Sequence, residues 1–287
     1  MSHVIETRAL TRRFRSQEAV NDLNLAMPAG SAFAFLGRNG AGKTTTIRML
    51  AGLLLPSHGG SALLGTDSTR LRPEDWRQIG YVSEDQRLYQ WMTGGELVAF
   101  TAALYPKWDH EFAKKLGGLL DLPLSRKVRT YSKGQRAKLS LLLSISYHPR
   151  LLILDEPFGG LDPLSREEFI SSLLEVMQQE EWSVFFSTHE IDDVERLADY
   201  VGIIEEGVLQ VSEPLETLQA RFRQVDTNAS TTPPGRAICV ETSGERLRYV
   251  DPDFPANANG GDASPMSLKQ IFLALAKNFQ LARRRSA

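Results

Sequence analysis

The positions of apolar residues along this 287-residue chain predict strands that alternate with helices. From about residue 94 to 148, again at 165–180, and from Asp192, apolar residues recur at intervals of three and four, which is typical of helices. This alternation predicts an α/β fold with a mostly parallel sheet core, an N-terminal antiparallel β part and an inserted helical subdomain at about 90–148. Segments with the pattern of strands lie at 3–8, 20–26, 31–36, 78–82, 151–155, 183–187, 200–206 and 208–212.

The composition changes after Arg223, and we expect residues 224–287 to form a C-terminal extension beyond a first domain at 1–223. The segment DTNASTTPPG (226–235) has the composition of a linker. Within residues 236–250, a run of alternating apolar and polar residues lies on each side of Ser-Gly, which predicts a hairpin. The following segment, 251–265, is expected to be a loop or disordered.

An amphipathic helix is predicted over residues 266–279, with Ser267 as its N-cap. An apolar face of this kind indicates core burial or self-association. The face consists of Leu268, Ile271, Phe272, Leu275 and Phe279.

A glycine-rich segment, GRNGAGKTTT, follows the apolar run SAFAFL. Gly37, Gly42, Lys43 and Thr44 match the spacing of the phosphate-binding loop, G-x-x-x-x-G-K-[ST]. The glycines let backbone N–H groups converge on phosphate oxygens, the lysine supplies a compact positive charge, and the threonine hydroxyl suits Mg²⁺. The segment after the loop predicts a helix whose positive N-terminus faces the anion. The chain is therefore expected to bind a nucleoside triphosphate.

Two adjacent carboxylates end a second apolar run, LLILDEP. Asp155 suits a contact with Mg²⁺ beside the phosphate loop. Glu156 suits positioning and deprotonating an attacking water. The alternative is a pair of solvated charges at a strand end, but the presence of the phosphate loop favours triphosphate hydrolysis.

The composition excludes several classes of protein. The net charge is −2, so no global basic field suggests a nucleic-acid partner, and the cluster Arg283-Arg284-Arg285 is expected to be a solvated tail. The single cysteine, Cys239, excludes a disulfide within the chain. The N-terminus has no apolar run of signal-peptide type, and no apolar stretch approaches the about 20 residues of a spanning helix. We therefore expect any membrane role to require a partner.

Three further segments complete a pattern that resembles the nucleotide-binding domain of ABC transporters. They are YSKGQ (131–135), GGLD (159–162) and STHE (187–190), and with the two motifs above they fall in the order of that family. The resemblance covers roughly residues 3–215. It implies a P-loop NTPase fold of ABC type, with ATP and Mg²⁺ as cofactors.

The resemblance also implies a head-to-tail dimer with a second copy or a homologous subunit, in which each ATP lies between the phosphate loop of one subunit and the signature segment of the other. Ser132 and the Gly134 N–H would contact the γ-phosphate across the interface, at the start of the helix that follows Gln135. Asp162 would lie at the subunit boundary, and His189 would hydrogen-bond the γ-phosphate. The remaining implied nucleotide contacts are Phe14, which matches the residue that stacks on adenine, and the loop residues Gly37, Arg38, Asn39, Gly40, Ala41, Gly42, Lys43, Thr44 and Thr45.

The chain departs from the family pattern at several positions. The family usually has Gln after the strand GYV, whereas GYVSE places Glu84 there. A carboxylate can ligate Mg²⁺, so the implied metal ligands are Thr44, Glu84 and Asp155, with Gln86 as an alternative to Glu84 through a shifted loop. Lys133 and Tyr131 replace the usual glycine and leucine of the signature. These replacements resemble family branches that export antibiotics, drugs and other lipophilic molecules, as do ALYPKWD and SLKQIFLALAK.

The implied function is an ATP-hydrolysing subunit at the cytoplasmic face of the cell membrane, coupling dimer closure to export through a separate integral membrane permease. The alternatives are an importer subunit, a soluble ABC-type ATPase acting on ribosomes or DNA, and a lone P-loop kinase or GTPase. The chain has one ATPase unit, no heptad run and no cysteine cluster, which favours a transporter subunit over an ATPase that acts on ribosomes or DNA. No residue predicts which cargo is transported. Candidates for the groove that receives the permease are Leu88, Tyr89, Trp91 and Met92, with internal packing as the alternative.

Overall fold

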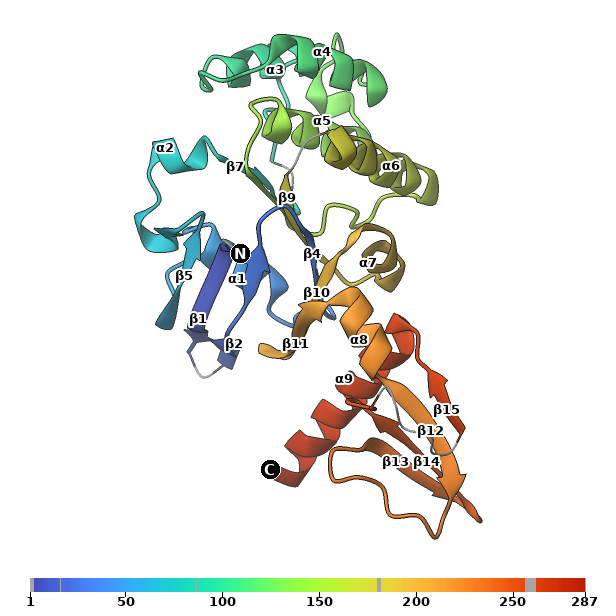
Figure 1. Ribbon diagram of the computed structural model, residues 1–287. Helices are drawn as coiled ribbons and strands as arrows, with labels where there is room; N and C mark the ends of the chain where they lie inside the picture. The colour runs from blue at the N-terminus through green and yellow to red at the C-terminus, as the bar shows by residue number, and fades with distance from the viewer. Residues whose placement is uncertain (1–2, 16, 86, 180–181, 256–261, 287) are drawn as a thin grey trace.

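The computed structural model describes residues 3–15, 17–85, 87–179, 182–255 and 262–286, and arranges them as three sheets with helices around them (Figure 1). The first sheet is antiparallel, with the order β2-β1-β5-β6 and β3 paired to β1. Its strands are β1 (His3–Phe14), β2 (Gln17–Leu23), β3 (Ala26–Pro28), β5 (His58–Leu63) and β6 (Thr66–Asp67). The antiparallel N-terminal part is thus confirmed, although β1 runs past the predicted 3–8. β5 and β6 were not predicted, because HGGSAL has too few apolar residues to show a strand pattern.

The second sheet forms the centre of the molecule, in the order β11-β10-β4-β9-β8-β7. Its strands are β4 (Ala32–Leu36), β7 (Ile79–Val82), β8 (Leu151–Leu154), β9 (Ser183–Thr188), β10 (Tyr200–Glu205) and β11 (Val208–Pro214). All neighbours are parallel except β10 and β11. Every residue of β4, β8 and β9 is buried, as expected for strands covered on both faces. The carboxyl ends of β4, β7, β8 and β9 consequently meet at one edge of the sheet.

Helices cover both faces of this central sheet. Two apolar clusters form the main core: one contains Leu154, Phe186 and Val201, and the other contains Phe33, Phe35 and Phe185. Alternate residues of one strand thus enter different clusters, as the two faces of a pleated sheet require. The covering helices are α1 (Lys43–Leu50), α2 (Pro73–Trp76), α6 (Pro163–Gln179), α7 (Ile191–Leu197) and α8 (Leu215–Arg221).

The predicted helical block lies between β7 and β8 and forms the top of the molecule in Figure 1. It contains α3 (Gly94–Ala102), α4 (His110–Leu119) and α5 (Lys133–Ile145), with a 3-10 turn at Val128–Thr130. α5 packs against α4, α6 and β7, and buries Leu141, Leu142 and Ile145 in the main core. The helical subdomain is therefore tied to the central sheet by its longest apolar helix.

A third sheet follows α8, in the order β13-β14-β12-β15. Its strands are β12 (Arg223–Asn228), β13 (Ile238–Ser243), β14 (Arg246–Asp251) and β15 (Asp262–Pro265). The predicted hairpin is confirmed as β13 and β14, with Gly244 at φ +60° in its turn. The linker prediction is wrong at 226–228 and the loop prediction is wrong at 262–265, because β12 and β15 are polar strands without an apolar alternation. Residues 256–261, which were expected to be loop or disorder, lie outside the described residues.

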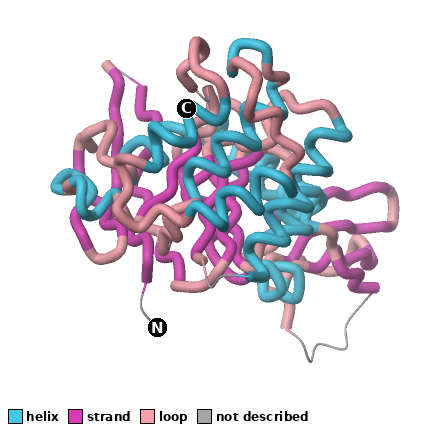
Figure 2. Tube along the Cα trace, turned by 90° about the horizontal axis from the view of Figure 1, so that it is seen from above, coloured by secondary structure: helices cyan, strands magenta, loops and turns pink. Residues whose placement is uncertain are grey.

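The chain ends with α9 (Leu268–Ser286). Ser267 caps this helix as predicted, since its Oγ accepts a hydrogen bond from Gln270 N at 3.3 Å. Leu268, Ile271 and Phe272 are buried in the main core against α7 and β10, so this part of the apolar face serves core packing. Figure 2 shows the strands near the N-terminus on one side of the molecule and the helices crowded over the middle.

Candidate functional site

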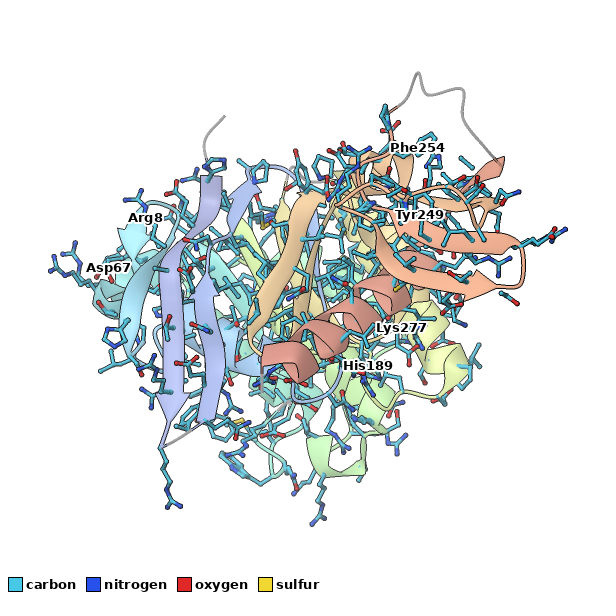
Figure 3. The ribbon with its side chains drawn as sticks, turned by 90° about the horizontal axis from the view of Figure 1, so that it is seen from below. Arg8, Asp67, His189, Tyr249, Phe254 and Lys277 are labelled. Atoms are coloured by element: carbon cyan, nitrogen blue, oxygen red, sulfur yellow. The ribbon has the colours of Figure 1, made fainter. Side chains whose placement is uncertain are left out.

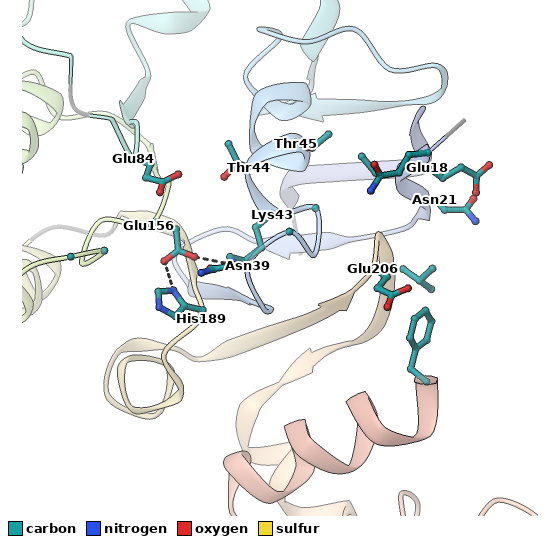
Figure 4. A pocket seen from close by; sticks show the side chains of 18 of the residues that line it. Glu18, Asn21, Asn39, Lys43, Thr44, Thr45, Glu84, Glu156, His189 and Glu206 are labelled. Atoms are coloured by element: carbon teal, nitrogen blue, oxygen red, sulfur yellow. Dashed lines mark hydrogen bonds and ion pairs between the residues drawn. The ribbon is translucent and has the colours of Figure 1, made fainter. Parts of the chain in front are cut away.

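A cavity of about 1140 Å³ lies at the edge where the parallel strands end. Loops after four different strands each supply a titratable residue at one end of it: Lys43 after β4, Glu84 after β7, Glu156 after β8 and His189 after β9 (Figure 4). Sites in open parallel sheets characteristically form at the carboxyl ends of the strands. The topology thus brings together residues that lie more than a hundred positions apart in the chain.

The phosphate loop runs from β4 to α1 with the close backbone approaches that its glycines allow. A Cβ at Gly37 would lie 2.6 Å from Ile204 O, and a Cβ at Gly42 would lie 2.5 Å from Ala19 O. Gly42 also has φ +107°, a conformation that other residues rarely adopt. Arg38 is exposed and Ala41 is buried in the core, whereas the loop residues that line the cavity are Asn39, Gly40, Gly42, Lys43, Thr44 and Thr45.

Lys43 is the central cation of the site. Its Nζ donates hydrogen bonds to Gly37 O at 2.7 Å and to Arg38 O at 3.1 Å. The same atom lies 3.0 Å from Glu156 Oε1, as an ion pair without hydrogen-bond geometry. Lys43 is thus held on the inner side of the loop by two carbonyls and one carboxylate.

Asp155 is buried directly behind the loop. Its Oδ1 accepts hydrogen bonds from Thr44 Oγ1 at 3.2 Å and from Ser187 Oγ at 2.9 Å. Burial raises the pKa of the Asp155 carboxyl, and the hydrogen bonds from Ser187 and Thr44 partly oppose this shift, whereas the nearby carboxylates of Glu84 and Glu156 reinforce it. The carboxylates of Asp155, Glu84 and Glu156 thus repel one another, and a cation bound among them would relieve this repulsion.

Glu156 lies between Lys43 and His189. Its Oε2 is 2.9 Å from His189 Nδ1, and its backbone N donates to Ser187 Oγ at 2.9 Å. Glu156 has φ +46°, so its backbone is held in the left-handed region that a residue with a side chain seldom adopts. Strained backbone of this kind is found at functional sites where the surroundings fix it.

Glu84 lines the cavity opposite Thr44, whereas its alternative Gln86 lies outside the described residues. The described residues include no group of three or more His, Cys, Asp or Glu side chains arranged to hold a metal ion by themselves. A cation here would therefore depend on Thr44 and on ligand oxygens in addition to the carboxylates.

Within the signature segment, Lys133 lines this cavity, whereas Ser132, Gly134 and Gln135 do not. They form the start of α5, where Gln135 N donates to Ser132 Oγ at 3.1 Å and Ser132 N donates to Gln135 Oε1 at 3.0 Å. A Cβ at Gly134 would lie 2.9 Å from Ser165, whose backbone N and Oγ donate to Asp162. The segment is therefore rigidly capped and packed against the start of α6.

Phe14 also lies apart from the cavity lining. It is 44% exposed at the end of β1, and the Arg12 guanidinium stacks over its ring at 4.6 Å from the centroid. The described part of the cavity wall includes one aromatic residue, Phe279 of α9.

Several residues of the site were not identified from the sequence. Ser187, behind the cavity wall, orients both Asp155 and Glu156, and its position as a polar residue in a fully buried strand was a usable signal. Glu206, Phe279 and Arg283 line the cavity, but no local motif marks them. Their placement depends on the turn between β10 and β11 and on the path of α9.

Comparison with known proteins agrees with this geometry. A family model described as ABC transporter matches residues 20–159. The chain is 34% identical over 226 residues to the bacitracin transport ATP-binding protein BcrA of Bacillus licheniformis, covering 78% of this chain and 74% of the relative. It is 30% identical over 266 residues to the ABC transporter ATP-binding protein YhcH of Bacillus subtilis, covering 89% and 87%. Among solved structures, the ATP-binding subunit of an ABC transporter aligns with a TM-score of 0.66 and 28% identity, covering 75% of this chain and 92% of the other. This chain is an ATPase that belongs to the ATP-binding subunits of ABC transporters.

Proposed function

We propose that this subunit drives export through a separate integral membrane permease, to which it binds at the cytoplasmic face of the cell membrane. The described residues contain no helix long and apolar enough to cross a membrane. The similarity to a protein named for bacitracin transport supports the exporter branch of the family. The observation that carries the proposal is the ion-paired Lys43 and Glu156 at the edge of the sheet, because it joins phosphate binding to hydrolysis.

The ATP phosphates would occupy the phosphate loop, with the Lys43 ammonium on the terminal phosphates. Thr44, Asp155 and Glu84 would hold Mg²⁺, which favours such hard oxygen donors. The residues fit the ion for two reasons. Both described hydrogen bonds to the Asp155 side chain end on Oδ1, so neither of them occupies Oδ2. Burial and the neighbouring carboxylates raise the pKa of Asp155, and a cation would stabilise the ionised carboxylate there. When bound, Mg²⁺ supplies positive charge to the phosphate oxygens.

Glu156 would act as the general base. In the structure Lys43 neutralises its Oε1 and His189 contacts its Oε2. A γ-phosphate that attracts Lys43 would release Oε1 to accept a proton from water. The water oxygen would then bond to the γ-phosphorus as the bond to the ADP oxygen breaks, with His189 on the other side of the carboxylate to hold its position.

A second copy of the chain, or a homologous subunit, would complete each site. Ser132 and Gly134 lie outside the cavity of their own chain, at the N-terminus of the 13-residue helix α5. A helix N-terminus with free N–H groups is an anion-binding site. We propose that it meets the γ-phosphate held by the partner, with Asp162 at the same boundary.

The permease would bind in a groove of about 380 Å³ between the central sheet and the helical subdomain. Leu88 and Tyr89 line this groove with Phe100, and the Tyr89 and Phe100 rings meet edge to face at 5.8 Å. Trp91 and Met92 are not part of its lining: Trp91 is exposed and Met92 packs in the helical subdomain. Exposed aromatic residues beside a concave surface favour a protein partner.

Inside-out membrane vesicles test the proposal, because ATP then reaches the subunit from outside. Vesicles that contain the subunit with its permease should accumulate labelled bacitracin, used as the probe, when ATP is added. Vesicles with the Glu156→Gln variant should not. Uptake by right-side-out vesicles loaded with ATP would instead indicate an importer, and co-purification of the subunit with ribosomes or DNA rather than a membrane protein would contradict a transport role.

A further inference from the structure

The nucleotide cavity extends from the phosphate loop to the C-terminal helix. Phe279 and Arg283 of α9 line it, together with Glu206 and Val208 from the turn between β10 and β11. These residues lie in the same cavity as Lys43, although more than 230 positions separate Lys43 from Phe279. Phe279 is partly buried and belongs to the apolar face whose earlier residues pack in the core.

The position of α9 is determined by packing along its length. Leu268, Ile271, Phe272 and Ala274 are buried in the main core, and Lys277 forms an ion pair with Glu241 of β13. Figure 3 shows the helix crossing the underside of the molecule from the C-terminal sheet toward the N-terminal sheet. Its last turns therefore extend past the anchored part and reach the mouth of the cavity.

A short chain of contacts links the end of α9 to the phosphate loop. Arg283 forms an ion pair with Glu206. The next residue, Gly207, donates its N–H to Ala41 O in the phosphate loop at 2.8 Å and accepts from Asn21 N at 2.8 Å. Gly207 has φ +82°, and a Cβ there would lie 2.8 Å from Ala19 O, so the turn is seated closely on β2. The Glu206 carboxylate is thus placed at a defined position relative to the loop.

We propose that Phe279 forms an apolar wall for the nucleobase and that the Arg283–Glu206 pair holds this wall in place. The inference rests on the proposed placement of the phosphates at Lys43, which leaves the base in the part of the cavity away from the β8 and β9 loops. The base has a π-face that an aromatic side chain can cover, and Phe279 is the aromatic residue that the described cavity lining offers. Phe14, with Arg12 over its ring, lies outside that lining.

Calorimetric titration of the full-length chain with ATP and with inorganic tripolyphosphate, both without Mg²⁺, tests the proposal. Tripolyphosphate has the same anionic groups but no base. Phe279→Ala should raise the Kd for ATP about tenfold and leave the Kd for tripolyphosphate unchanged, because stacking involves only the base. Phe279→Tyr, which keeps the ring, should bind ATP like the wild type. Leu273→Ala is the matched control, since Leu273 is 57% exposed on the same helix and does not line the cavity.

The ion pair gives a second, independent measurement. Arg283→Glu should weaken ATP binding about threefold, and adding Glu206→Arg should restore it, because the exchanged charges can pair again. Equal loss of ATP and tripolyphosphate affinity in Phe279→Ala, or an unchanged ATP Kd, would overturn the proposal. A wild-type chain that binds neither ligand would instead contradict the placement of the phosphates at Lys43.

Discussion

The Lys43 ammonium and the Glu156 carboxylate form an ion pair 3.0 Å apart, and each side chain is less than one-tenth exposed. The pair joins the loop that would bind phosphate to the residue that would activate water. Buried ion pairs repay their desolvation only when the remaining donors and acceptors are also satisfied. Lys43 meets this condition through two carbonyls. The Glu156 carboxylate meets it through His189 at Oε2, with Lys43 itself beside Oε1.

We expect the two members of this pair to differ in their effect on stability. Lys43→Met leaves a buried carboxylate without its cation and should lower the free energy of unfolding of the nucleotide-free protein by about 3 kcal/mol. Glu156→Gln leaves Lys43 with its two carbonyl acceptors and should cost about 1 kcal/mol. Urea unfolding measures both, and the double variant should lose less than the sum of the two. Additive losses would show that the pair is not coupled.

Asp155→Asn should stabilise the nucleotide-free protein at neutral pH. The pKa of Asp155 is raised mainly by burial, so the folded state binds its proton more tightly than the unfolded state. Stability is therefore lost as the pH rises from the ordinary Asp value of 3.8 through the raised folded value, and above that value the loss is complete. The asparagine Oδ1 can keep the hydrogen bonds from Thr44 and Ser187.

Thermal unfolding from about pH 4 to pH 8 measures this effect. The Tm difference between Asp155→Asn and the wild type should grow as the pH rises above 3.8, reach a few degrees, and become constant above the raised folded value. Addition of Mg²⁺ and ATP should reverse the order, since the wild type gains more from the ligand. A variant that is less stable than the wild type at pH 7.5 without nucleotide would contradict the raised pKa of Asp155.

Glu84→Gln should separate the binding of ATP from the binding of Mg²⁺. Removing the Glu84 charge relieves repulsion of the phosphates, so ATP affinity in EDTA should rise about threefold. The Mg²⁺ concentration for half-maximal ATP hydrolysis should increase severalfold, because one anionic oxygen is lost. Asp85→Asn is the control, because this substitution removes the same charge from the same loop. Asp85 pairs with Arg87 and does not line the cavity. Identical effects of both variants would show that Glu84 acts only through net charge.

The groove prediction depends on Tyr89. Tyr89→Ala should weaken association with the permease about 30-fold, the effect typical of a tyrosine at the centre of an interface. ATP hydrolysis by the isolated subunit should be unchanged, because Tyr89 does not line the nucleotide cavity. Leu119→Ala provides the comparison, since Leu119 is exposed on α4 and away from the groove lining. Loss of binding in both variants would indicate a general surface effect.

The family, the α/β fold and the central part of the site could be predicted from the sequence. The parallel strands are continuous apolar runs, and Lys43, Asp155, Glu156 and His189 each follow such a run. Because parallel strands end at the same edge of a sheet, the apolar runs alone predict that these residues lie close together. The correct order of the motifs then restricted the fold to one family.

The parts that were not predicted depend on polar strands and long-range contacts. β12 and β15 pair through their backbones and carry few apolar residues, so their segments had the composition of a linker and a loop. Phe279 lies on an apolar helix face like its core neighbours, and only the length of α9 beyond the core places it at the cavity. No local pattern distinguishes these two roles.

The shared ATP site is the central claim, and a dimerisation assay on two matched variants tests it most directly. Ser132→Asp and Ser132→Asn both keep an oxygen that can cap α5, but only aspartate adds a negative charge where the partner's γ-phosphate would lie. Both are made in Glu156→Gln, which should bind ATP without hydrolysing it, and sedimentation velocity is measured with and without ATP. The account predicts ATP-dependent dimers for Glu156→Gln alone and with Ser132→Asn, and monomers that still bind ATP with Ser132→Asp. ATP-loaded Glu156→Gln that stays monomeric, or equal dimerisation of the two Ser132 variants, would contradict it.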